Sequence, residues 1–214
     1  MPVGFQILNA DEVTVQIDDT YANLAVVEMG TKATDTATAA GGNSSVTFSK
    51  AGLKNPLIAV AGSNPQVAVC WLIDASTGTW GFNITSGGGI GTQARYLIFD
   101  SPPATTTNFG RQIFDANGNK TFDSNFRYLR VVDMQLNAVG PFNYDASKQY
   151  AVCHLRFGFR VWNQTGFNQV QGSTVSGGTV SLSYLAVATV PGSPAQLNQM
   201  TPSLLILDIT NYGL

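Results

Sequence analysis

Charged residues are scarce in this sequence. Asp, Glu, Lys and Arg make up 11% of the 214 residues, whereas an average soluble domain has about 25%. The formal net charge is −2 and the basic residues form no run, so neither charge-driven disorder nor a nucleic-acid-binding patch is indicated. Surfaces with so few charges are common in proteins whose faces are covered by neighbouring proteins. The alternative is a simple soluble β-sandwich rich in Thr and Asn.

Long apolar runs are absent as well. No run approaches the roughly 20 residues that a membrane-spanning helix needs. The N-terminal segment Met1–Gln6 also lacks the basic region and the apolar core of a secretory signal. We therefore expect synthesis in a reducing cytoplasm and no membrane insertion.

Histidine and cysteine, the usual residues of metal and nucleophile sites, are nearly missing. The single His154 leaves little for general-base catalysis or zinc binding, and no His-x-x-His or Cys-x-x-Cys spacing occurs. Cys70 and Cys153 lie in similar apolar runs on what we take to be equivalent strands, and a disulfide between them is possible but disfavoured in a reducing compartment. Cys153 and His154 are strand neighbours, so their side chains point to opposite faces. The sequence predicts no catalytic, cofactor-binding or metal-binding residue, and no cofactor.

Two polar segments resemble ligand loops only in part. Asp115–Asn119 has the residue types of a calcium loop, but its glycine is at the fourth position and Phe126 stands where a Glu is required. A turn is the better interpretation. The Gly-rich segment Ser86–Thr92 lacks the Lys-Ser/Thr pair and the following helix of a phosphate loop. It is better interpreted as a long strand connection.

Two features leave open the alternatives that the protein is an enzyme or that it binds a sugar. Two acids from distant strands are able to meet in a glycosidase site, although the chain has only 13 acids. Trp71, Trp80 and Trp162 are candidates for a sugar-stacking platform. Tryptophan in such apolar runs is more often a core residue, and we expect that role here.

The dominant pattern is an internal repeat. Residues 4–29 and 110–134 align with a single one-residue gap. Each copy is typical of a strand, a tight turn and a strand, and Asn117-Gly118 is a strong hairpin signal, although the first copy has Asp11-Glu12-Val13 there. The recurrence of this hairpin pattern at the start of each half predicts an internal duplication. The identical pairs are Gly4/Gly110, Gln6/Gln112, Ile7/Ile113, Ala10/Ala116, Asp18/Asp123, Leu24/Leu129, Val26/Val131, Val27/Val132 and Met29/Met134.

Short strands separated by turn clusters fill the rest of the chain. No segment has a convincing helical period, and the one possible helical turn is near Ser49–Leu53. We predict an all-β fold of two tandem antiparallel β-sandwich-like modules, residues 1–103 and 110–214, with a linker at 104–109. The expected strands include 24–27, 46–48, 56–61, 67–74, 79–84, 94–99, 128–136, 150–157, 159–162, 179–188 and 204–208.

Two details of the second half bear on packing. The segment 128–136 is apolar on both alternating faces, which predicts a strand that is covered on both sides or changes face at a β-bulge. Ser176–Pro191 weakly echoes the pattern from Ser86 to Pro102. We therefore expect the duplication to extend through each half.

The repeat also resembles a known family. Gly4–Ala10 and the segment Gln112–Asp133, with its Phe-Asp-Ser and Leu-Arg-Val-Val runs, are similar to small tail proteins of tailed bacteriophages. The resemblance covers the two copies of the repeat alone. It implies a β-rich tail-tip, baseplate or tail-fibre-associated component without enzymatic activity, and it carries over no functional residue.

These observations predict a structural virion component of a phage tail, made in the host cytoplasm. We expect contacts with other phage tail proteins and a homo-oligomer, for which three- or six-fold symmetry is natural in a tail. The alternatives are a receptor- or carbohydrate-binding tip module for host attachment and a capsid decoration protein. In a tip module, a host-surface receptor or glycan would meet the loops Thr31–Ser45, Ser86–Thr92 and Gln164–Gly178.

Overall fold

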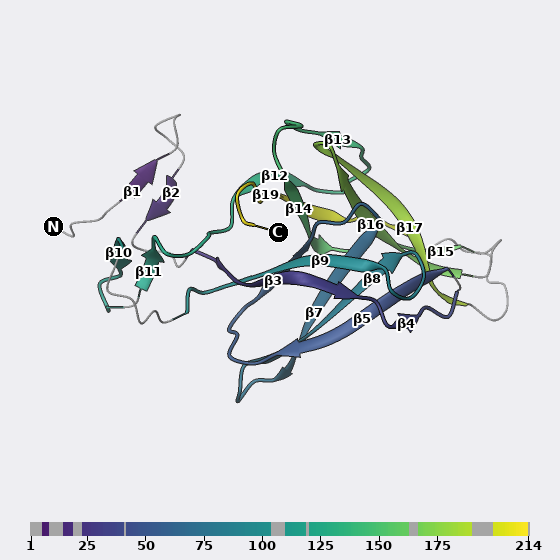
Figure 1. Ribbon diagram of the computed structural model, residues 1–214, viewed down its shortest axis with the longest axis horizontal. Helices are drawn as coiled ribbons and strands as arrows, with labels where there is room; N and C mark the ends of the chain where they lie inside the picture. The colour runs from purple at the N-terminus through teal and green to yellow at the C-terminus, as the bar shows by residue number, and fades with distance from the viewer. Residues whose placement is uncertain are drawn as a thin grey trace.

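The chain folds into β-strands joined by turns. The computed structural model describes residues 6–8, 15–18, 23–40, 42–103, 110–118, 120–162, 167–189 and 199–213 (Figure 1). Within these residues there is no helix, and every strand pair is antiparallel. The predicted all-β, antiparallel fold is therefore confirmed. The possible helical turn near Ser49–Leu53 is wrong, because this segment is the end of a strand followed by a bend.

The first large sheet contains six strands, three from each half of the chain. β6 (Leu57–Val60) and β14 (Tyr150–Arg156) join the two groups of three through the pairs Val60–Val152 and Ala59–Cys153. In spatial order the strands are β12 (Val131–Gln135), β19 (Ser203–Asp208), β14, β6, β9 (Gln93–Asp100) and β3 (Ala25–Ala33).

The second large sheet also draws on both halves. Its two groups meet where β16 pairs with β7, at Ser173–Gln66. The main path runs β13 (Phe142–Asn143), β17 (Thr179–Thr189), β16 (Phe167–Ser176), β7 (Gln66–Asp74), β8 (Thr79–Gly87), β5 (Asn43–Lys50) and β4 (Thr36–Ala37), and β15 (Phe159–Trp162) pairs with β16 and with β18 (Gln199–Met200).

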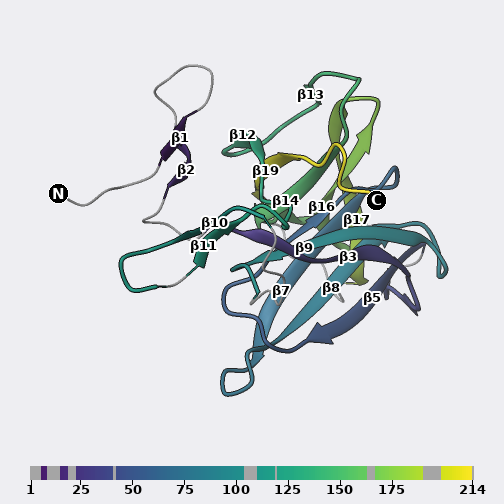
Figure 2. The same cartoon turned by 60° about the vertical axis from the view of Figure 1, so that its left-hand side comes forward.

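Two short hairpins form separate two-stranded sheets. β1 (Gln6–Leu8) pairs with β2 (Val15–Asp18), and β10 (Gln112–Phe114) pairs with β11 (Lys120–Asp123). Both lie to one side of the two large sheets (Figures 1 and 2).

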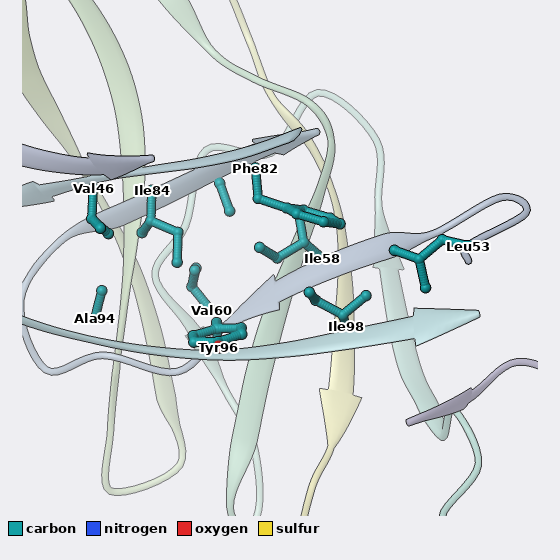
Figure 3. Packing of buried hydrophobic residues seen from close by; sticks show 10 residues of the cluster. Val46, Leu53, Ile58, Val60, Phe82, Ile84, Ala94, Tyr96 and Ile98 are labelled. Atoms are coloured by element: carbon teal, nitrogen blue, oxygen red, sulfur yellow. The ribbon is translucent and has the colours of Figure 1, made fainter. Parts of the chain in front are cut away.

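Three hydrophobic clusters hold the sheets together. The first core lies between the two large sheets and comes entirely from the first half of the chain (Figure 3). The second core lies between the same sheets and comes entirely from the second half. The shared core covers the other face of the six-stranded sheet and takes residues from both halves: Ala59, Ala61, Leu97, Phe99, Ala151, Cys153, Leu207, Ile209 and Tyr212.

Strand alternation explains how one sheet serves two cores. In β9, Tyr96 and Ile98 pack in the first core, whereas Leu97 and Phe99 pack in the shared core. Successive side chains of a strand point to opposite faces, so a strand that is apolar at every position has both faces covered. Leu97, Ile98 and Phe99 are all fully buried. This run therefore ties the intersheet core to the shared core.

The predicted modules share their sheets. The expected linker 104–109 lies outside the described residues, and each half has an intersheet core of its own. Yet both large sheets continue from one half into the other, through the pairs of β6 with β14 and of β7 with β16. A strand's partner is not encoded in its local pattern, so these two pairings were not predictable from the sequence.

The two copies of the repeat pair in the same way. Both hairpins have the same register, and each has a register shift at the same repeat position, after Ile7 and after Ile113. The next strands agree too, since β3 shifts register at Val27 and β12 shifts at Val132. β3 and β12 lie at opposite edges of the six-stranded sheet. The origin of this correspondence by duplication stays a prediction.

Two weaker matches in the sequence do not correspond in space. The echo of residues 86–102 in 176–191 aligns β9 with β17, which lie in different sheets. Cys70 and Cys153 are also in different sheets, on β7 and β14, and both thiols are free. Apolar runs of this kind recur in any buried strand, so the likeness reflected burial and not equivalent position.

Candidate functional site

The most exposed apolar surface of the second half lies on β12 and the turn after it. We call it the β12 surface. Its side chains are 45–77% exposed, although all are large and apolar: Val131, Val132, Met134, Leu136 and Val139. The predicted β-bulge in 128–136 is confirmed, because the pairing of β12 with β19 shifts register between Val131 and Asp133. The predicted covering of both faces is wrong for this chain by itself.

The β12 surface extends the apolar face that the shared core occupies. β12 is the edge strand of the six-stranded sheet, and among the described strands it pairs with β19 alone. Met134 pairs with Leu205, and Val131 pairs with Leu207. Both leucines belong to the shared core or pack against it. Edge strands present unpaired backbone groups, so this edge offers hydrogen bonds as well as apolar side chains.

The opposite face of β12 is fixed by polar contacts. Asp133 accepts hydrogen bonds from Gln135 Nε2 at 2.6 Å and from Tyr144 Oη at 2.8 Å. These hydrogen bonds hold the pKa of the Asp133 carboxyl below its usual range. At the start of the strand, Arg130 Nη2 lies 3.4 Å from Asp208 Oδ1. β12 is therefore held in place while its apolar side chains face outward.

The equivalent strand β3 is covered where β12 is open. Val26 N donates to the carbonyl oxygen of Arg127 at 2.8 Å, and Leu129 N donates to that of Leu24, also at 2.8 Å. Arg127 Nη1 lies 3.9 Å from the sulfur of Met29. Val26 and Met29 are half-buried and pack against the shared core. The segment after the second hairpin thus covers the first half's edge.

A pocket lies beside this crossing. It has a volume of about 340 Å³ and is lined by Arg127, Arg130 and Tyr212, among others. Both arginines are already engaged: Arg127 donates to the carbonyl oxygen of Tyr212, and the Arg130 guanidinium lies 4.8 Å from the centre of the Tyr212 ring. These cations anchor the C-terminal turn, which argues for a structural role.

Of the three predicted binding loops, two are largely strands. Thr31–Ser45 contains the end of β3, the edge strand β4 and the start of β5, and within Gln164–Gly178 residues 167–176 form β16. Ser86–Thr92 begins with the end of β8, and residues 88–92 are a connection that hydrogen bonds hold against Thr31–Ser45. Ser44 Oγ donates to the carbonyl oxygens of Gly88 and Gly89, each at 2.9 Å.

The residues suited to chemistry are dispersed or enclosed. Burial raises the pKa of the Cys153 thiol to about 12 and lowers that of His154 to about 4. Asn117 N donates to Asp115 Oδ1 at 2.9 Å, so the suspected calcium loop is an ordinary turn as far as it is described. In the described part of the chain, no three His, Cys, Asp or Glu side chains gather as metal ligands. No helix long and apolar enough to cross a membrane occurs in that part either.

The three tryptophans differ in their surroundings. Trp80 packs against the first core, as expected. Trp71 is 41% exposed, so the expectation of a core residue is wrong there. The side chain of Trp162 lies outside the described residues. The sequence alone does not separate Trp71 from Trp80, because both stand in apolar strands.

Comparison with known proteins identifies no relative. The chain matches no protein family, no curated protein and no solved structure.

Proposed function

We propose that this protein is a structural component of a bacteriophage tail, without enzymatic activity, that assembles through the β12 surface. The observation that carries the proposal is the row of large apolar side chains left open along one sheet edge. Contiguous exposed apolar surface marks a site of association in soluble proteins. The similarity of the repeat to phage tail proteins supplies the proposed place in the virion, at the tail tip, the baseplate or a fibre.

The geometry favours a second copy of the chain as a partner. Within one molecule, the segment with Arg127 and Leu129 already lies in extended form along β3, the other edge strand of the same sheet. A head-to-tail interface between identical copies closes into a ring when the rotation between copies allows it, and a ring suits a tail component. Other tail proteins would then contact the ring through its remaining surfaces.

The test is the molar mass of the full chain in solution, measured by light scattering during gel filtration. We expect an oligomer for the natural sequence and a monomer for the double variant Met134→Asp, Leu136→Asp, because charge on the interface opposes its burial. Ile90→Asp is the matched control, since Ile90 is 63% exposed and lies in the turn before β9. A monomeric natural protein, or an oligomer that survives the double variant, would refute the proposal.

A capsid decoration protein is the second structural candidate. It would use the same surface at a different place in the particle. Immunogold labelling of intact virions separates the two, because label at the distal tail supports the tail assignment and label over the head supports decoration.

A further inference from the structure

A second exposed feature lies on the outer face of β7, β8 and β5, apart from β12 in both views of the fold (Figures 1 and 2). Trp71 of β7 pairs directly with Gly81 of β8. Its indole ring lies on this glycine, because a Cβ added to Gly81 would be 2.4 Å from Trp71 Cε2. Gly81 is buried by the ring, whereas the ring itself is 41% exposed. The glycine therefore lets the indole rest against the sheet and stay open to solvent.

Uncharged polar groups continue this face beside the ring. Asn83 Nδ2 donates to Thr47 Oγ1 at 2.9 Å, and Thr85 Oγ1 donates to Asn83 Oδ1 at 3.1 Å. Ser49 pairs with Gly81 and is exposed. The second amide hydrogen of Asn83 and the hydroxyls of Thr47 and Ser49 have further hydrogen-bonding capacity. An aromatic plane thus adjoins a row of donors and acceptors in fixed positions.

The charged side chains of these three strands lie on the other face or at the end of this one. Lys50 points to the other side of β5, where its Nζ lies 3.0 Å from Glu28 Oε2. Asp74, the last residue of β7, pairs with Thr79 at the end of this face, and its carboxylate accepts hydrogen bonds from Ser76 and Thr77. Because β5, β7 and β8 place no cation on this face, an anionic ligand would find no counter-charge here. The outward positions around the ring include Thr47, Ser49, Val69, Gly81 and Asn83.

We propose that this face, the Trp71 face, binds a neutral carbohydrate. A pyranose ring has an apolar side of C–H groups, which stacks on an indole, and a rim of hydroxyls that both donate and accept hydrogen bonds. The Trp71 face offers one aromatic plane and an uncharged polar rim, which match those two parts. The inference goes beyond the proposed structural role and does not depend on it, because the face is separate from the β12 surface.

Affinity electrophoresis of the full chain tests the proposal. Native gels would contain dextran, starch, mannan or hydroxyethyl cellulose as neutral probes, and heparin as the charged one. We expect slower migration in at least one neutral gel and none in heparin. Trp71→Ala should weaken binding by about tenfold or more, since stacking on the ring is lost. Ile73→Ala is the matched control, as Ile73 is 53% exposed on the same strand.

A second variant keeps the tryptophan and moves it. Gly81→Ala places a methyl group where the ring now lies, so it should weaken binding while the protein still melts as a folded domain. Gly89→Ala is its control, because a Cβ there meets nothing within 4 Å. No retardation in any neutral gel, retardation in heparin alone, or a Trp71→Ala variant that binds like the natural protein would overturn the proposal.

Discussion

β3 and β12 have the same sequence pattern, the same β-bulge and equivalent places at the two edges of one sheet, yet one is covered and the other is open. Val26 and Met29 are half-buried, whereas Val131 and Met134 are about half exposed. The difference does not come from the strands themselves. It comes from what lies along each edge.

The covering side chain explains the contrast. Arg127 reaches Met29 and also donates to the carbonyl oxygen of Tyr212, which fastens the segment 125–129 along β3. The residue at the corresponding position of the first copy is Ala22. The alanine side chain has no group that could donate such a hydrogen bond. Strands of similar sequence thus become an internal edge or an external surface according to the segment that lies beside them.

The largest effect is expected in the shared core, which both edges adjoin. Leu207 is fully buried and pairs with Val131. Leu207→Ala should lower the free energy of unfolding by about 2–5 kcal/mol, because it leaves a cavity among packed side chains. Chemical denaturation measures this. Two separate transitions, one for each half, would contradict a core that both halves share.

The next effect compares the halves at a position where the ring nitrogens of His154 are enclosed. His154 holds in β14 the place that Val60 holds in β6, one residue after the pair Ala59–Cys153. Burial lowers the pKa of His154 to about 4 in the folded protein, from 6.5 in the unfolded chain. Stability should therefore fall as the pH decreases through this window, by about 2 kcal/mol between about pH 7 and about pH 5.

The variant His154→Val isolates this contribution. It removes the only histidine and restores the residue type of the first half. Denaturation curves at the two pH values should then nearly coincide. If the natural protein and the variant lose the same stability on acidification, the enclosed imidazole is not the cause.

A smaller effect is expected from removing the cover of β3. Arg127→Ala makes the second copy of the repeat resemble the first at this position. The loss of the contacts with Met29 and Tyr212 should cost about 1–2 kcal/mol, and Met29 should become as exposed as Met134. Oxidation of methionines followed by mass spectrometry reports that exposure. Unchanged protection of Met29 would show that Arg127 is not its cover.

The smallest effect on stability is expected on β12. Met134→Ser should change the unfolding free energy of the monomer by less than about 0.5 kcal/mol, since the side chain is mostly in solvent. The same substitution should weaken association. A large loss of monomer stability would mean that Met134 is packed within its own chain.

Local chemistry was predictable from the sequence, and pairing across the chain was not. Apolar alternation indicated the strands, and the Asn117-Gly118 pair indicated a hairpin that the structure has, with Gly118 at a φ of 81° beside the β-bulge. The joining of β6 to β14 was not predictable, because any two apolar runs of suitable length satisfy the same pattern.

The candidate surfaces were even less accessible to sequence reasoning. The segment 128–136 predicted a strand covered on both faces, because Val131, Val132 and Met134 are apolar. The sequence of this segment does not show that these side chains are exposed in the fold. Trp71 and Trp80 point to opposite faces of one sheet, Trp71 onto Gly81 and Trp80 toward the first core. Such cross-strand neighbours are set by register, which the tertiary fold decides.

The most direct test of the central comparison is hydrogen exchange of the two edge strands across a dilution series. Amides of β12, residues 131–135, should become more protected as the protein concentration rises, because a second copy covers them. Amides of β3, residues 25–33, should keep the same protection throughout, because their cover is internal. Protection of β12 that does not depend on concentration would contradict assembly through this surface.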